Sequence, residues 1–200
     1  MFIKTEHGFW RQVDPQPFVY TEDYKQKQST NSEMSYLRLG WLTSFFTFEQ
    51  MRQMSIVDVG CGNSCFAQCA ENVFGKVAKY DVVGESITKE QLYDTDWDIV
   101  VLSDVLEHFE DINDLFKMRW KYCFISFPET PVVNNWEQLV TWRHFKPNEH
   151  LWCLNRNGMS EWFIEAGCDV VAISHFEDFI RRRWDPRYPN ITTMLVERAK

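Results

Sequence analysis

The sequence lacks the features that would place the chain in a membrane or in an oxidising compartment. No run of about eighteen apolar residues occurs, so no membrane span is expected. The first residues do not combine a basic region with an apolar stretch, so no secretory signal is predicted. We therefore expect a cytoplasmic protein whose six cysteines are reduced thiols.

An excess of basic residues is also missing. The chain has 29 acidic side chains against 21 lysines and arginines, which gives a formal net charge of −8. Tight, sequence-independent binding to nucleic-acid phosphates requires a dense basic face, so it is not expected here. The local exception is a cluster formed by Arg181, Arg182, Arg183 and Arg187. We interpret this cluster as a solvated helix end or loop, although it leaves a protein or RNA partner possible.

No repeat and no linker rich in Pro, Gly or Ser divides the 200 residues, which are 44% apolar, so one globular unit with a proper core is predicted. A pair of metal-binding CxxC loops is absent as well. Cys61, Cys65 and Cys69 share a four-residue spacing, but zinc sites usually pair their ligands through shorter loops. No metal site is predicted, and these thiols are expected to be buried between a helix and a sheet.

Beyond an irregular N-terminal stretch over residues 1–29, helical and extended patterns alternate along the chain. A capping box from Thr30 to Glu33 predicts a helix over residues 31–51. The predicted strands are residues 55–59, 76–82, 98–102, 122–127, 169–174 and 191–197, and the later helices are residues 65–73, 112–119 and 158–166. Such alternation is typical of an α/β fold with a mainly parallel sheet and helices on both faces.

A glycine turn follows the first of these strands directly. Residues 56–64 read IVDVGCGNS, in which Gly60 and Gly62 can adopt backbone angles that are closed to other residues. Ligands of open α/β sheets bind beyond the carboxyl ends of the strands. Asp81 ends the next strand, where its carboxylate could accept both hydroxyl protons of an adenosine ribose. Residues 103–108, SDVLEH, follow the third strand and place polar groups at the same edge.

These segments, in this order, resemble the class I S-adenosylmethionine-dependent methyltransferases, and weaker similarity over residues 144–151 resembles the bacterial small-molecule branch. The resemblance covers about residues 54–175 and implies a Rossmann-like sheet of seven strands whose last strand is antiparallel. It implies that S-adenosylmethionine is the cofactor and that residues 54–200 bind it, with residues 1–53 on the lid or substrate side. The implied cofactor residues are Asp58, Gly60, Cys61 and Gly62 for the methionine moiety, Asp81 for the ribose, and Ser103, Asp104 and Val105 for the wall of the site.

Two other interpretations use the same turn. A nicotinamide-binding Rossmann protein would need a third glycine three residues after Gly62, where this chain has Cys65. Asp58, ahead of the first glycine, also suits a sulfonium amino acid better than a pyrophosphate. The second interpretation is a protein of this fold that has lost turnover and serves as a cofactor-binding or assembly component.

The region after the second strand is shorter than the resemblance implies. Only residues 83–97 separate the second strand from the third, whereas a full strand–helix–strand unit takes about thirty residues. We therefore expect the helix to be cut to a turn and the strand near residues 86–91 to be short or missing. Ile87 could then flank the adenine. Ser64, in place of a final glycine in the turn, is a smaller departure.

Methyl transfer requires an acceptor aligned with the methyl group and, for some acceptors, the removal of a proton. His144 and His150 are the candidate bases, because they lie in the segment where this fold builds its acceptor pocket. The segment after the third strand lacks the Pro-Pro-aromatic motif of DNA amino-methylating enzymes, and no Pro-Cys pair offers a nucleophile for cytosine-C5 methylation. A small molecule that accepts the methyl group through O, N or C is therefore the expected substrate. The sequence does not determine the oligomeric state.

Overall fold

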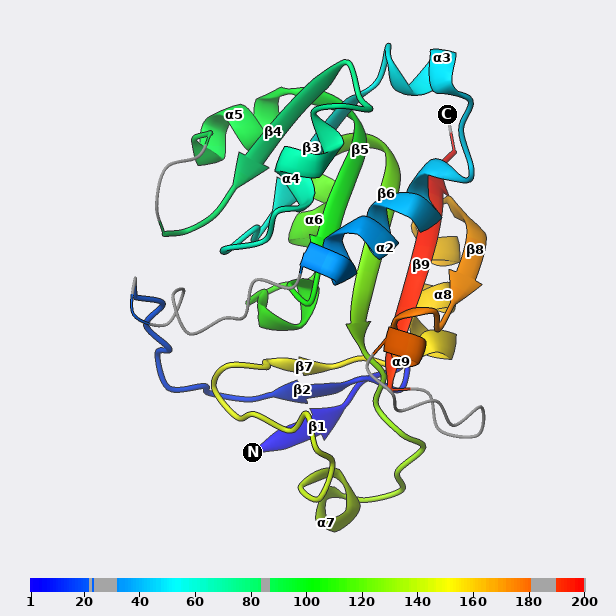
Figure 1. Ribbon diagram of the computed structural model, residues 1–200. Coiled ribbons are helices and arrows are strands. Elements are labelled where there is room, and N and C mark those ends of the chain that lie inside the picture. The colour runs from blue at the N-terminus through cyan, green and yellow to red at the C-terminus, as the bar shows by residue number, and fades with distance from the viewer. Residues whose placement is uncertain (22, 24–31, 84–86, 181–189, 200) are drawn as a thin grey trace. The chain divides into compact units, whose positions relative to one another are not determined.

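A computed structural model describes residues 1–21, 23, 32–83, 87–180 and 190–199 (Figure 1). By its internal contacts the chain divides into two compact units. Unit 1 comprises Met1–Phe18, Asp104–Ile112 and Ile125–Lys200, and unit 2 comprises Val19–Ser103 and Asn113–Phe124. No helix among the described residues is long and apolar enough to cross a membrane. The expected division at residue 53 stays a prediction.

Unit 2 contains three parallel strands that lie side by side (Figure 1). β3 (Ser55–Val59) lies between β4 (Lys76–Tyr80) and β5 (Asp96–Ser103). The register pairs Val59 with Tyr80 on one side and with Leu102 on the other, so the three strands end at the same edge. The last four residues of β3 are buried, as expected for a parallel strand that is covered on both faces.

Short helices connect and flank these strands in unit 2. They are α2 (Ser32–Thr43), α3 (Phe48–Met51), α4 (Phe66–Ala70), α5 (Lys89–Asp94) and α6 (Asp114–Lys117). At its start α5 has a capping box in which the Thr88 hydroxyl accepts from the Gln91 amide and the Gln91 side chain accepts from the Thr88 amide. This reciprocal pairing satisfies two amides that a short helix would otherwise expose.

Unit 1 contains an antiparallel pair and a small separate sheet. β8 (Cys168–Ser174) pairs with the last strand, β9 (Ile191–Arg198), and α8 (Arg156–Glu165) precedes them. The small sheet has the order β1–β2–β7 and is antiparallel, with β1 at Phe2–Lys4, β2 at Trp10–Gln12 and β7 at Trp152–Cys153 (Figure 1). The remaining helical turns are η1 (Leu106–His108), α7 (Trp136–Leu139) and α9 (Glu177–Ile180).

The strands of the main sheet follow the order β4-β3-β5-β6-β9-β8, where β6 is Arg119–Pro128. The predicted fold class is confirmed: a central, mostly parallel sheet whose last strand, β9, runs antiparallel to its neighbour. The implied number of seven strands is wrong for the described residues, which form six in this sheet. As expected from the short connection between β4 and β5, residues 87–91 form no strand, whereas the helix is longer than the expected turn, because α5 extends over Lys89–Asp94.

Two other predictions about elements are corrected. The stretch over residues 1–29, predicted to be irregular, contains β1 and β2, whose apolar side chains join Val133, Leu139 and Cys153 in one buried cluster. The single helix predicted over residues 31–51 is two helices, α2 and α3.

Side-chain hydroxyls account for the break between these two helices. Thr43 and Ser44 donate to the carbonyls of Gly40 and Trp41, and Thr47 starts α3 with its own capping box. Hydroxyls in such positions compete with the helical backbone pattern. The helix predicted over residues 112–119 is shorter as well, because Arg119 already belongs to β6. Thr30 and Asn31 of the predicted capping box lie outside the described residues.

Candidate cofactor site

The glycine turn after β3 has the backbone geometry that its sequence requires. Gly60 and Gly62 have φ angles of 66° and 50°, in the left-handed region that favours glycine. The Gly60 amide donates to the Tyr80 carbonyl at 2.7 Å, which fixes the turn against the end of β4. A Cβ atom built on Gly62 would meet nothing within 4 Å, so the backbone there is open to a ligand.

Asp81 joins this turn to the strand that precedes it. One carboxylate oxygen accepts from the Gly62 amide at 2.7 Å and the other accepts from the Val83 amide at 2.9 Å. The carboxylate is half-buried at the edge where β3 and β4 end. Because each carboxylate oxygen has two acceptor sites, both oxygens can also accept from a ribose diol.

Asp58 lies at the base of the turn and is only 3% exposed. Its Oδ2 atom is buried and has no hydrogen-bond partner among the described residues. Burial raises the pKa of this carboxyl to about 7; Arg38 opposes the shift and the Asp81 carboxylate adds to it. A buried carboxylate oxygen without a donor is costly, and an incoming ammonium group would supply the missing partner.

The cysteines around the turn differ in their surroundings. All six cysteines of the chain are thiols. Cys61 is buried, as expected, whereas Cys65 and Cys69 are partly exposed, with their sulfur atoms 3.9 Å apart. Ser64, the departure from the glycine pattern, bonds to the Ser35 hydroxyl of α2 at 3.3 Å.

The predicted wall of the site begins at the end of β5. Ser103 ends this strand, and its neighbour Leu102 pairs with Val59, so Ser103 lies at the same strand edge as the glycine turn. Asp104 has an unusual φ angle of 57° and donates its amide to the Ser126 carbonyl at 2.9 Å. Val105 then leads into the helical turn η1. A positive φ angle at a residue other than glycine is typical of functional turns that the surrounding structure holds in place.

The two candidate bases have different environments in unit 1. His144 is partly exposed, and its Nε2 atom lies 2.7 Å from the Asn190 amide oxygen. His150 is 4% exposed, and burial lowers its pKa to about 3, with further contributions from His108 and Lys146. A general base works best with a pKa near the operating pH, so the lowered pKa of His150 does not suit that role.

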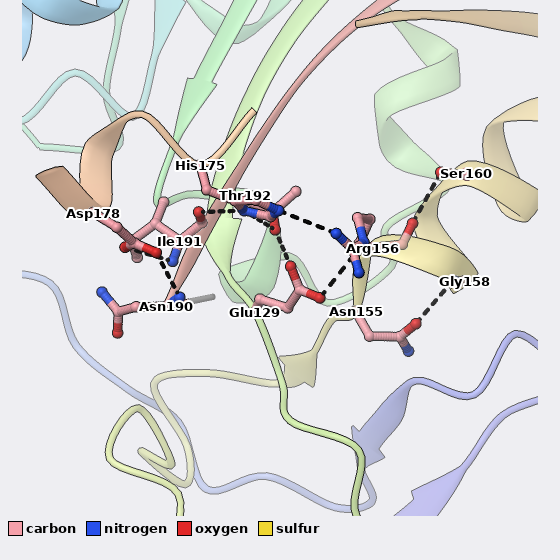
Figure 2. A network of polar contacts seen from close by, with 10 residues as sticks. All are labelled: Glu129, Asn155, Arg156, Gly158, Ser160, His175, Asp178, Asn190, Ile191 and Thr192. Atoms are coloured by element: carbon pink, nitrogen blue, oxygen red, sulfur yellow. Dashed lines mark hydrogen bonds and ion pairs between the residues drawn. The ribbon is translucent and has the colours of Figure 1, made fainter. Parts of the chain in front are cut away.

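One polar network of unit 1 could not be predicted from the sequence (Figure 2). The His175 ring binds the Ile191 carbonyl through Nδ1 at 3.1 Å, and its Nε2 accepts from Arg156 at 3.2 Å. The Thr192 hydroxyl donates to Glu129. Asp178 accepts from the amides of Asn190 and Ile191, which secures the start of β9. These residues come from separate elements, so no local spacing could have revealed them.

The chain resembles known proteins both in sequence and in fold. The family model described as a methyltransferase domain matches residues 32–173. No curated protein matches the sequence. Many solved structures are similar in fold.

One similar structure is an S-adenosylmethionine-dependent methyltransferase from Archaeoglobus fulgidus, with 14% identity, a TM-score of 0.59 and coverage of 90% of this chain and 100% of that chain. Another is 1,6-didemethyltoxoflavin-N1-methyltransferase from Burkholderia thailandensis with bound 1,6-didemethyltoxoflavin and S-adenosylhomocysteine, with 10% identity, a TM-score of 0.60 and coverage of 100% of this chain and 99% of that chain. A third is magnesium protoporphyrin IX methyltransferase from Synechocystis PCC 6803 with bound S-adenosylmethionine, with 11% identity, a TM-score of 0.53 and coverage of 84% and 79%.

Proposed function

Since this chain belongs to the class I S-adenosylmethionine-dependent methyltransferase superfamily, we propose that it transfers the methyl group of this cofactor to an oxygen, nitrogen or carbon atom of a small molecule. The observation that carries the proposal is the buried, unpartnered Oδ2 of Asp58 beside a glycine turn with an open backbone. Two of the similar structures are enzymes named for small-molecule acceptors, and the net charge of −8 does not favour a nucleic acid.

In this proposal each cofactor residue has a separate task. Asp58 binds the ammonium group of the methionine moiety, and the backbone from Gly60 through Cys61 to Gly62 approaches its carboxylate end. Asp81 accepts from the ribose hydroxyls. Ser103, Asp104 and Val105 form the wall of the site.

Methyl transfer requires little from the protein beyond the alignment of the acceptor atom with the methyl group. The bound sulfonium supplies an activated methyl group with a neutral thioether as leaving group. The acceptor atom forms a bond to the methyl carbon while the carbon–sulfur bond breaks and its electron pair stays on sulfur. When the acceptor carries a proton, His144 is the proposed base, and the N-terminal residues 1–53 contribute to the acceptor side.

Titration of the purified chain with S-adenosylhomocysteine tests the cofactor site. We expect binding by the wild type and a loss of affinity of about tenfold or more in Asp81→Asn, which keeps the shape of the side chain but removes the charge-assisted acceptor. Asp96→Asn is the matched control, because Asp96 is exposed and pairs with Arg119 away from the turn. No binding by the wild type, or equal binding by Asp81→Asn, would contradict the proposal.

Transfer itself needs a separate measurement. Cofactor carrying a radiolabelled methyl group, incubated with the chain and fractions of cell extract, should label a small-molecule fraction. Label in protein or RNA would instead assign a macromolecular acceptor, with the arginine cluster at residues 181–187, outside the described residues, as the first place to mutate. Cofactor binding without any transfer would favour the assembly component over the enzyme.

A further inference from the structure

A buried cluster in unit 1 brings together two imidazole rings and a carboxylate that methyl transfer does not use. Glu107 and His108 belong to η1, and His150 lies directly before the segment that leads into β7. One potential ligand atom from each of these three residues lies within 4.8 Å of the other two. Glu107 is 2% exposed and His150 4% exposed, so the cluster is not a chance grouping of surface side chains.

The protein holds these residues in place through its backbone. The Leu151 amide donates to the Glu107 carbonyl at 2.8 Å, which joins the chain next to His150 to η1. The His150 amide donates to the Lys146 carbonyl at 2.8 Å. The two rings meet edge to face, with their centroids 4.8 Å apart and their planes at 86°. The cluster is therefore assembled by contacts independent of anything bound to it.

The hydrogen bond of His108 fixes which of its nitrogens carries the lone pair. Its Nδ1 atom lies 2.8 Å from the Glu149 carbonyl oxygen, which can only accept, so Nδ1 carries the proton. The lone pair is then on Nε2. Metal-binding histidines usually have this arrangement, in which the second ring nitrogen donates to a backbone carbonyl or carboxylate and sets the orientation of the ligand atom.

The surroundings of the His150 ring also indicate that a ligand binds to this cluster. Its Nδ1 atom is buried and has no hydrogen-bond partner among the described residues, and its Nε2 atom lies 3.9 Å from the nearest Glu149 oxygen. A buried polar atom without a partner is costly, so a group that binds it would recover that free energy.

From this geometry we propose that Glu107, His108 and His150 bind a divalent first-row transition-metal ion. Two imidazoles and one carboxylate form a donor set that suits Zn²⁺ and Fe²⁺ and leaves coordination positions for water or for an oxygen or nitrogen donor of a small molecule. An ion at the centre of three atoms 4.8 Å apart lies about 2.8 Å from each, and bonds of about 2.1 Å require side-chain shifts of less than about 1 Å.

The proposal does not depend on methyl transfer, and its test uses the metal alone. The purified full-length chain, freed of metal with a chelator, is titrated with ZnCl₂ by calorimetry. We expect one Zn²⁺ per chain and a loss of affinity of about tenfold or more in both Glu107→Gln and His150→Gln. His7→Gln is the matched control, because His7 also lies beside a carboxylate, Glu165 at 2.9 Å, but outside the cluster.

A second measurement identifies the ligands in the wild type, whether or not the variants fold. Zn²⁺ should shift the imidazole proton resonances of two histidines, and Co²⁺ should give visible absorption bands without a thiolate-to-cobalt charge-transfer band. A thiolate band would show that a cysteine binds the ion, either Cys65 with Cys69 or Cys153 near Glu107, and would overturn the proposed set of ligands. Absence of wild-type binding, or affinities unchanged in folded Glu107→Gln and His150→Gln, would overturn it as well.

Discussion

At the scale of single residues, Asp58 shows how burial changes the chemistry of a side chain. Its carboxyl is buried beside a second carboxylate, and its pKa of about 7 follows mainly from burial. A bound ammonium group would favour the ionised form and lower this pKa. The residue is thus suited to respond to the charge of its ligand.

This pKa predicts a dependence of stability on pH. The folded protein holds the Asp58 proton more tightly than the unfolded chain, whose pKa is near the ordinary value of 3.8. The stabilising contribution is therefore complete below about pH 4 and is lost as the pH rises through about 7. Between about pH 5 and pH 8 the wild type should lose roughly 2 to 3 kcal/mol of unfolding free energy relative to Asp58→Asn. Urea denaturation of both proteins at the two pH values measures the difference, and parallel pH profiles would show that the shift is absent.

At the scale of secondary-structure elements, two helical glycines predict opposite effects of the same substitution. A Cβ atom on Gly158 of α8 would lie 2.1 Å from the His7 backbone oxygen, whereas one on Gly40 of α2 would meet nothing within 4 Å. Gly158→Ala should therefore cost about 1 to 3 kcal/mol through overpacking. Gly40→Ala should stabilise the protein by about 0.5 to 1 kcal/mol through helix propensity. Thermal unfolding of the two variants tests the pair, and a stabilised Gly158→Ala would contradict the close packing.

The elements also show what the sequence could reveal. β3 has the predicted bounds, residues 55–59, because a continuous apolar run that ends in a glycine turn has few alternative structures. β1 and β2 escaped prediction because each has three residues and their sheet depends on β7, far along the chain. A pattern within a short window contains no information about such distant pairing.

The same contrast holds for the site. Gly60, Gly62 and Asp81 could be identified because a strand, a turn and the next strand place them at one edge, and the structure joins Gly62 to Asp81 by a hydrogen bond. Their roles toward the cofactor stay predictions. The sequence places Glu107 and His108 in one polar segment and His150 in another. Their proximity could not be predicted, because it depends on backbone contacts between η1 and the segment before β7.

At the scale of the whole molecule, the chain passes repeatedly between its two units. Unit 1 is built from three segments and unit 2 from two, and β6 contributes Arg119–Phe124 to one unit and Ile125–Pro128 to the other. Because a continuous strand belongs to both, we expect them to unfold together in a single transition. Tryptophan fluorescence and far-UV circular dichroism should give coincident urea curves. Two separated transitions would show that the units are independent.

The shortened connection after β4 affects how readily copies of the molecule aggregate through the edges of their sheets. Among the described strands β4 is an outer strand of the main sheet, and an outer strand offers its backbone to strands of other chains. Part of this edge is already occupied, because the Ile87 amide donates to the Lys79 carbonyl at 3.1 Å. Lys76 and Lys79 lie on this strand, and the Lys76 ammonium also rests over the Trp97 ring, 4.8 Å from its centroid. Pairing with a second β4 would bring like charges together and bury them, so these lysines protect the protein against edge-to-edge aggregation.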